Sequence, residues 1–363
     1  MDSRTRFSLL PLNPANLGNY PYIISGEGGF SETEREPAMS SNPSVDAKKP
    51  PFIGLWLKAM RVPFLQATFV PVILGGVVAW ETVHVFSWST FLLTLLGASL
   101  IQIASNMFND YFDFKSGNDL QVRHQNPFAG GGRILTADWI RPSTHLIVST
   151  SCLILGSLIG FYLIFALGLY QLFWFGLVGV ISTYFYVGPP FKLAYRGVGE
   201  FLVGLNFGPV MTLGAYYVQT KSLASATVPL LASIPVGLLI AAVLWINEFP
   251  DMDADKAVGK KTLVLRLGYL RSVAVYVGLL ATSYFLLLLY AVLKVFVSFP
   301  ITSFATLIAL FSLPFALKAV RILRANYKDP HAIIPANANT IILHLTFGLL
   351  AIVGFVIGGL AGL

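Results

Sequence analysis

The same five-residue pattern (an asparagine, an acid, an aromatic residue, any residue and an aspartate) occurs twice in this chain. The first copy is Asn-Asp-Tyr-Phe-Asp at 109–113, followed by Asp119, and the second is Asn-Glu-Phe-Pro-Asp at 247–251, followed by Asp255. Each copy together with its trailing aspartate is called an acidic motif below. Beyond residue 50 the chain has eleven Asp and Glu residues, and seven of them lie in these two windows. Clustering of scarce carboxylates predicts that both motifs hold metal ions.

Oxygen-rich clusters of this kind suit Mg²⁺, which in proteins takes one or two carboxylates and completes its shell with substrate phosphates and water. We therefore expect two Mg²⁺ ions, bridged by a substrate diphosphate, between the motifs. Residues three or four apart share one helix face, so each motif can present several oxygens together. Asp253, about 200° around the helix from Asp251, is expected to point away. The predicted metal ligands are Asn109, Asp110, Asp113, Asp119, Asp251 and Asp255.

Other side chains near the motifs are predicted to bind the substrates. Cations can hold phosphate oxygens, arginine through a bidentate fork. An aromatic ring such as Tyr184 can stabilise a nearby carbocation, although anchoring at the membrane interface explains it equally well. The predicted substrate-binding residues are Asn106, Asn109, Arg123, Asn247, Lys260, Lys261, Arg61 and Tyr184, and the predicted catalytic residues are Asp113, Asp251, Asp255 and Lys192. The alternative is that the carboxylates only cap helices or pair with loop cations.

The composition indicates a membrane protein. The mean hydropathy is +0.72, and 11% of residues are charged, against about 25% in an ordinary soluble domain. The net charge of +7 is spread over short loops, so it predicts membrane orientation and no nucleic-acid partner. The one cysteine, Cys152, lies in an apolar run, which excludes a disulfide framework and a thiolate metal site. Residues 1–50 are polar and aperiodic and are predicted to be a disordered tail before a single domain at 51–363.

Nine apolar runs of about 18 to 25 residues predict an all-α polytopic fold with nine transmembrane helices, in which each acidic motif occupies a helix end. Basic residues gather in the loops on one side, so the N-terminus and both motifs are expected in the cytoplasm and the C-terminus outside, in the cell membrane. The predicted spans are 62–80, 88–108, 146–167, 170–187, 198–218, 228–248, 273–296, 300–320 and 340–361.

These motifs resemble those of the UbiA superfamily of intramembrane prenyltransferases. The family's first motif, Asn-x-x-x-Asp with a later Asp, corresponds to Asn109, Asp113 and Asp119, and its second, Asp-x-x-x-Asp, to Asp251 and Asp255. The resemblance covers about residues 52–363. It implies a nine-helix bundle around a central cavity, with Mg²⁺-bound polyprenyl diphosphate as the donor and an aromatic molecule as the acceptor.

Within the family, the segments 113–119 and 251–263 together with Arg123 look most like the menaquinone branch. That resemblance implies 1,4-dihydroxy-2-naphthoate as the acceptor, prenylated with loss of its carboxylate. The branch often has Asn where this chain has Glu248, so the role of Glu248 is left open. Homogentisate, 4-hydroxybenzoate, a chlorin or a glycerol phosphate are alternative acceptors. A secondary transporter is an alternative of another class, but its sites would lie near the bilayer midplane rather than at helix ends.

Overall fold

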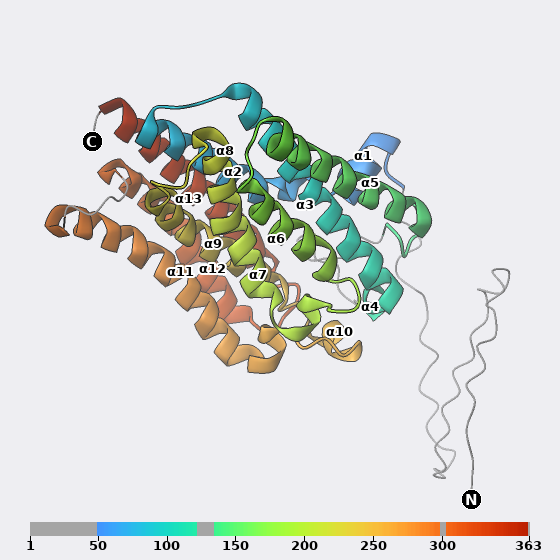
Figure 1. Cartoon of the computed structure of the whole chain (residues 1–363). Coiled ribbons are helices and arrows are strands. Elements are labelled where there is room, and N and C mark those ends of the chain that lie inside the picture. Colours follow the sequence, from blue (N-terminus) through green and yellow to red (C-terminus); the bar gives the residue numbers. More distant parts are fainter. Residues whose placement is uncertain (1–48, 122–133, 298–302, 362–363) are drawn as a thin grey trace, which may run out of the picture. The chain divides into compact units, whose positions relative to one another are not determined.

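The computed structural model describes residues 49–121, 134–297 and 303–361, and every regular element in these ranges is a helix (Figure 1). The all-α prediction is therefore confirmed. The predicted disordered tail falls almost entirely outside the described residues and stays a prediction. Eight segments of the described chain are long and apolar enough to cross a membrane: Val62–Val83, Trp88–Ser116, Pro142–Ala166, Gly199–Thr220, Thr227–Asn247, Leu263–Phe296, Phe304–Asn326 and Ile334–Ala361.

The remaining predicted span, 170–187, corresponds to a shorter apolar helix. Helix α6 (Leu172–Phe185) has 14 residues, fewer than the ~20 that a straight span through a bilayer needs. The count of nine spans thus remains a prediction, although eight of the predicted spans coincide with transmembrane-length segments. The other helices are α1 (Phe52–Ala59), η1 (Val62–Leu65), α2 (Gln66–Val83), α3 (Trp88–Ser116), α4 (Asn118–Gln121), α5 (Pro142–Phe161), η2 (Tyr162–Ala166), η3 (Leu193–Arg196), α7 (Gly199–Leu205), η4 (Asn206–Val210), α8 (Met211–Thr220), α9 (Thr227–Asn247), α10 (Met252–Ala257), α11 (Leu263–Val297), η5 (Phe304–Ser312), α12 (Leu313–Asn326) and α13 (Ile334–Ala361).

The first acidic motif lies on the last two turns of a long helix. Helix α3 continues eight residues beyond the predicted span and ends at Ser116, because Gly117 adopts a left-handed conformation (φ 79°). The Gly117 backbone N–H donates to the carbonyls of Asp113 and Phe114, which satisfies groups that a helix end leaves open. The chain then turns directly into α4, which carries Asp119.

The second acidic motif spans a break between two helices. Helix α9 ends at Asn247, and Pro250 stands in the following turn, where its ring cannot disrupt a helical hydrogen bond. Asp251 precedes the first residue of α10, and its carbonyl accepts from the Asp255 backbone N–H at 2.8 Å. Helices α4 and α10 contact one another at the same end of the helical domain, as Figure 1 shows.

Glycines let the helices around the motifs pack closely. A Cβ at Gly237 on α9 would lie 2.6 Å from the carbonyl oxygen of Gly204 on α7, closer than real Cβ atoms approach. Small residues of this kind allow helix backbones to pack in a bilayer, where van der Waals contact replaces the hydrophobic effect as the driving force. This contact fixes α7 and η4 against α9, the helix that leads into the second motif.

Candidate functional site

A cavity of about 260 Å³ is lined by residues of both acidic motifs. Along α3 its lining changes from Ile101, through Asn106 and Asn109, to Asp113, about 18 Å further at 1.5 Å per residue. Along α9 it changes from Ile240 to Asn247 in the same way. The cavity therefore has an apolar part and a carboxylate-rich part. It suits a molecule with an apolar chain and a charged group.

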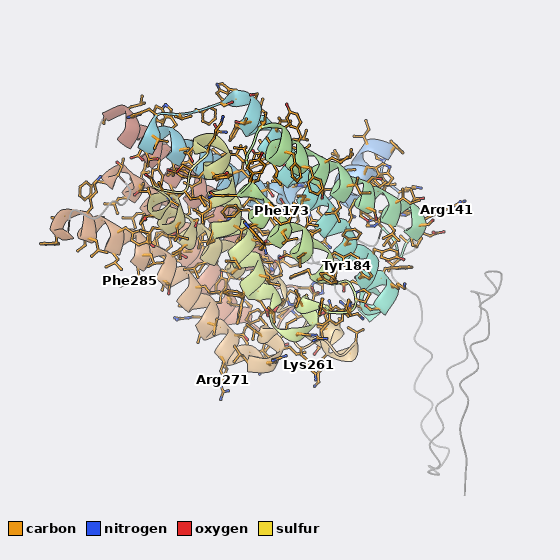
Figure 2. All side chains as sticks on the ribbon, in the orientation of Figure 1. Arg141, Phe173, Tyr184, Lys261, Arg271 and Phe285 are labelled. Atoms are coloured by element: carbon orange, nitrogen blue, oxygen red, sulfur yellow. The ribbon has the colours of Figure 1, made fainter. Side chains whose placement is uncertain are left out.

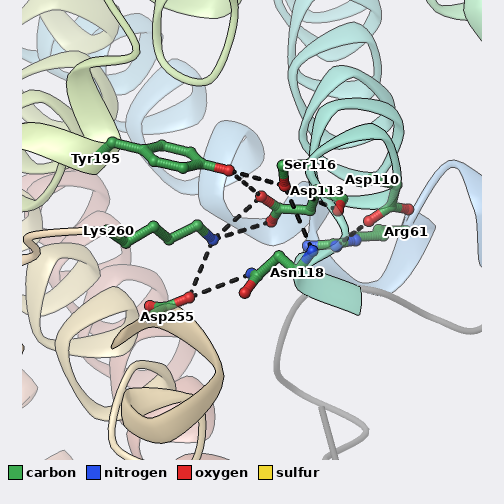
Figure 3. Close-up of polar contacts among 8 residues, drawn as sticks. All are labelled: Arg61, Asp110, Asp113, Ser116, Asn118, Tyr195, Asp255 and Lys260. Carbon is green, nitrogen blue, oxygen red and sulfur yellow. Dashed lines mark hydrogen bonds and ion pairs between the residues drawn. The ribbon is translucent and has the colours of Figure 1, made fainter. Parts of the chain in front are cut away.

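An ammonium group links the two motifs. Lys260 Nζ lies 3.1 Å from Asp113 Oδ1 and 3.1 Å from Asp255 Oδ1, so it contacts one carboxylate from each motif (Figure 3). Asn118, beside Asp119, donates from Nδ2 to the same Asp255 oxygen at 3.2 Å. The predicted meeting of the two motifs is thus a feature of the structure, and a cation is held where they meet.

Burial and crowding of the carboxylates shape their charge. Burial, reinforced by neighbouring carboxylates, raises the pKa of Asp251 to about 8 and that of Asp119 to about 7. Burial also raises the pKa of Asp255. Burial alone would lower the pKa of Lys260, but Asp113 and Asp255 raise it above its usual value. These aspartates therefore hold their protons more strongly than usual. A divalent cation bound nearby would favour their ionised forms instead.

Four oxygens of cavity-lining residues have no hydrogen-bond partner among the described residues: Asn118 Oδ1, Asn206 Oδ1, Glu248 Oε2 and Asp251 Oδ1. Buried oxygens of this kind are costly unless a donor or a cation reaches them. No group of three or more His, Cys, Asp or Glu side chains converges on one point in the part of the chain that the structure describes. This donor set fits Mg²⁺, which needs only one or two carboxylates per ion when phosphate oxygens and water supply the rest.

Asp110 and Arg61 do not lie as their predicted roles would suggest. The Arg61 guanidinium donates to the Asp110 carboxylate, and this pair is largely buried between α3 and the turn after α1. Arg61 lines the cavity, whereas Asp110 does not. Helical phasing explains the difference, because Asp113 faces the cavity and a residue three positions earlier is rotated by about 60°. The carboxylate predicted as a metal ligand thus holds an arginine at the cavity wall.

The three asparagines predicted to bind substrate line the cavity, but two of them are already engaged with neighbouring groups. Asn106 Nδ2 donates to the Met60 carbonyl at 3.4 Å. Asn247 Oδ1 accepts from Asn337 Nδ2 of α13 at 2.7 Å, so its amide oxygen faces another helix. Asn109 is the asparagine at the carboxylate-rich part for which no such contact is recorded in the described chain.

Three further predicted residues lie outside the cavity lining. Lys192 is exposed, and its Nζ is 5.4 Å from the centre of the Tyr195 ring. Lys261 is also exposed, with its side chain directed outward (Figure 2). Tyr184 packs edge-on against Phe108 and Phe112, while Tyr186, two residues later, lines the cavity. Arg123 lies outside the described residues.

Exposed Asp253 confirms the helical phasing of the second motif, because Asp255 on the same short helix is buried. Tyr195, by contrast, was missed by the sequence analysis. Its hydroxyl donates to Asp113 Oδ1 at 3.2 Å, and its ring centre lies 5.0 Å from Lys260 Nζ. Tyr195 lies 82 residues after Asp113 in the sequence, and no local sequence pattern predicts that their side chains meet.

Glu200 was also missed, although a lone acid at the start of an apolar run is a usable signal. Its Oε1 accepts from the Leu263 backbone N–H at 2.6 Å and so holds the loop that carries Lys260. Burial, the nearby Glu200 carboxylate and Asp255 raise the pKa of Glu248 well above its usual value. Glu248, which lines the cavity, thus lies beside a second carboxyl group.

Known proteins resemble both the sequence and the fold. The model of the UbiA prenyltransferase family matches residues 68–341. A 1,4-dihydroxy-2-naphthoate octaprenyltransferase of Bacillus subtilis is 34% identical over 63% of this chain and 71% of its own length. A 2-carboxy-1,4-naphthoquinone phytyltransferase of Synechocystis is 28% identical over 89% of this chain and 99% of its own.

Among solved structures, a UbiA homologue from Archaeoglobus fulgidus bound to DMAPP and Mg²⁺ superposes with a TM-score of 0.54. It is 16% identical, and the match covers 82% of this chain and 99% of that one. At this identity the likeness concerns the fold alone.

Proposed function

The chain belongs to the UbiA prenyltransferase family, and from this premise we propose that it transfers a polyprenyl group from polyprenyl diphosphate to 1,4-dihydroxy-2-naphthoate in a Mg²⁺-dependent reaction. The observation that carries the proposal is the cavity with two unlike parts. Its carboxylates meet around Lys260 at one part, and Ile101, Ile240 and Met211 line the other. A diphosphate carried on an apolar chain matches this division of charge.

Asp113, Asp119, Asp251 and Asp255 would hold two Mg²⁺ ions, which supply Lewis-acid neutralisation of the diphosphate. The chain's own contribution is to fix these oxygens on α3, α4 and α10 at one end of the helical domain. Lys260 is placed to donate hydrogen bonds to the departing diphosphate, because its ammonium already lies between the two motifs. Lys260 would therefore stabilise the negative charge that develops on the leaving diphosphate without having to change position.

In the reaction, the allylic C–O bond breaks and its electron pair leaves with the diphosphate. The electron-rich ring of the acceptor then forms a C–C bond to the allylic cation, and the ring carboxylate departs as CO₂. The apolar lining around Val243, Leu244 and Phe207 excludes water that would otherwise capture the cation. Arg61, which lines the cavity beside the first motif, is placed to bind the acceptor carboxylate before it leaves.

The choice of acceptor is supported by the relatives whose names specify naphthoate or naphthoquinone substrates. The experiment that tests it is incubation of membranes containing the full chain with Mg²⁺, a polyprenyl diphosphate and one of three acceptors: 1,4-dihydroxy-2-naphthoate, homogentisate or 4-hydroxybenzoate. Mass analysis of the lipid product is expected to show the naphthoate with its carboxyl group replaced by the prenyl group. Membranes with the Asp113→Ala chain are the control.

Prenylation of 4-hydroxybenzoate with its carboxyl group retained, and no product from the naphthoate, would overturn the acceptor and leave prenyl transfer standing. No prenylated product from any acceptor, in protein that remains folded, would overturn the proposed reaction itself.

The orientation in the membrane is part of the proposal. The distribution of basic residues supports a cytoplasmic N-terminus and active site and an external C-terminus. A reporter fused after Leu363 is expected on the external side, and one inserted near residue 130 in the cytoplasm. Both reporters on one side of the membrane would contradict this topology and the count of nine spans.

A further inference from the structure

The exposed face of α12 changes character along its length. Phe311, just before the helix, and Leu317 within it are 76% and 58% exposed. From Lys318 onward four exposed positions are cationic, and they follow one another at helical spacing: Lys318, Arg321, Arg324 and, just beyond the helix, Lys328. The opposite face, with Ala316, Ala319 and Leu323, is buried. We call these four cations the basic stripe.

The basic stripe carries more cations than acids: between residues 311 and 330 the chain has these four cations and one acid, Asp329. The ion pairs Arg61–Asp110, Lys260–Asp113 and Lys260–Asp255 lie at the acidic motifs. The acid nearest in sequence, Asp329, uses its Oδ1 to accept the backbone N–H groups of His331 and Ala332 at 2.9 and 3.0 Å. Lys328 Nζ lies 5.9 Å from the Tyr327 ring centre. The stripe therefore presents an excess of positive charge on one exposed face.

The basic stripe lies on the same side of the membrane as the acidic motifs. The Tyr327 ring contacts the Tyr269 ring, near the start of α11, at 5.9 Å, and Asn337 near the start of α13 donates to Asn247. Lys318 is eight residues before the end of α12 at Asn326, about 12 Å along the axis. Its flexible side chain can extend along the helix to bring the ammonium to the level of lipid head groups.

We propose that the basic stripe binds the head-group phosphates of anionic phospholipids, with the acyl chains against the apolar face at Leu313 and Leu317. The apolar-to-cationic order along one exposed face matches the order of acyl chain and phosphate in a lipid. Basic residues spread over loops satisfy the orientation rule, but they do not require this alignment on a lipid-facing helix. The stripe is separate from the cavity, so the inference does not depend on the proposed reaction.

The test uses the full chain purified in a neutral detergent, with native mass spectrometry to count bound lipids and thermal unfolding as a second readout. Phosphatidylglycerol is compared with phosphatidylcholine of the same acyl chains. The R321Q/R324Q variant is compared with R141Q/K221Q, which removes two exposed cations elsewhere. Each cation at an anionic surface contributes about a five-fold preference, so R321Q/R324Q should weaken phosphatidylglycerol binding about 25-fold.

The expected result is selective binding of phosphatidylglycerol by the wild type and by R141Q/K221Q, lost in R321Q/R324Q. Equal binding of the two lipids by the wild type, or undiminished binding by R321Q/R324Q, would overturn the proposal. Sodium phosphate at the same concentration should raise the unfolding temperature less than phosphatidylglycerol does. An equal rise would show that the stripe binds anions without recognising a lipid, and it would also overturn the proposal.

Discussion

The two acidic motifs share a sequence pattern but not a backbone. The first runs along a continuous helix, so Asp110 and Asp113 point in different directions and only Asp113 faces the cavity. The second crosses a helix break, so Glu248, in the position equivalent to Asp110, remains in the cavity lining together with Asp251. Residues at equivalent positions of the two motifs therefore have different neighbours. Asp110 binds the guanidinium of Arg61, whereas Glu248 faces the carboxyl group of Glu200.

This comparison teaches that the two motifs share a pair of aspartates each, Asp113 with Asp119 and Asp251 with Asp255, rather than the whole pattern. Asp113 and Asp255 each contact Lys260, and Asp119 and Asp251 each line the cavity and have raised pKa values. The second-position acids have different partners: Asp110 pairs with Arg61, and Glu248 lies beside Glu200.

The largest expected effect is loss of turnover when either motif loses the aspartate that contacts Lys260. Asp113→Ala and Asp255→Ala should each lower kcat/KM by on the order of 10³-fold, because each removes an oxygen from the diphosphate site. Asp253→Ala, on the exposed face of α10, is the matched control and should retain near-normal activity. A loss for Asp253→Ala equal to that for Asp255→Ala would contradict the phasing of the second motif. Thermal unfolding should show that all three variants remain folded.

A somewhat smaller loss is expected when the link between the motifs is removed. Lys260→Met should lower kcat/KM by on the order of 10²-fold, because the ammonium that would bind the leaving diphosphate is missing. Lys256→Met, an exposed cation on α10, is the control. Kinetics at saturating donor separate a loss in kcat from a loss in donor affinity. Unchanged kcat/KM in Lys260→Met would show that Lys260 holds the structure only.

Substitutions of the two second-position acids, Asp110 and Glu248, should differ in their effect on stability rather than on activity. Asp110→Asn should cost about 1–3 kcal/mol, because the largely buried Arg61 loses a charged hydrogen-bond partner. Glu248→Gln should cost little or add stability, because burial and the nearby Glu200 carboxylate raise the pKa of Glu248 and a neutral amide avoids placing a charge there. Thermal unfolding of both variants at neutral pH measures the difference. Equal destabilisation would mean that the two positions are equivalent after all.

The smallest effect concerns pH in a metal-free buffer. Folding raises the pKa of Asp251 from 3.8 to about 8, so between these values the folded chain keeps a proton that the unfolded chain has released. Stability should therefore fall as the pH rises through this window. Asp251→Asn should reduce that fall and gain at least about 1 kcal/mol at about pH 8 with EDTA present, the equivalent of one pKa unit. A wild-type melting temperature that rises toward pH 8 would contradict this.

Much of the fold could be predicted because a bilayer imposes apolar runs of fixed length. The helix ends were harder, because Gly117 and Gly268 act through local backbone conformation. Gly268 (φ 72°) separates two helices within α11, which begins ten residues before the predicted span. The short α6 was predicted as a full span because hydropathy does not record where α-helical hydrogen bonds stop.

At the site, the meeting of the motifs and the outward direction of Asp253 followed from spacing. The Arg61–Asp110 pair and the Tyr195 contact did not, because they join residues 49 and 82 positions apart. Lys192 was predicted from its charge alone. Its left-handed backbone (φ 47°) and its exposure depend on the packed loop around it.

The glycine turn at the end of α3 has a consequence for how this chain can diverge. Asp113 and Asp119 are held in register by one helical turn, one left-handed residue and one short helix. A substitution at exposed Lys115 leaves that register intact, whereas inserting or deleting one residue would shift the left-handed turn at Gly117 and displace Asp119 relative to Asp113. Among descendants of this sequence, the segment from 113 to 119 should therefore vary in composition while keeping its length.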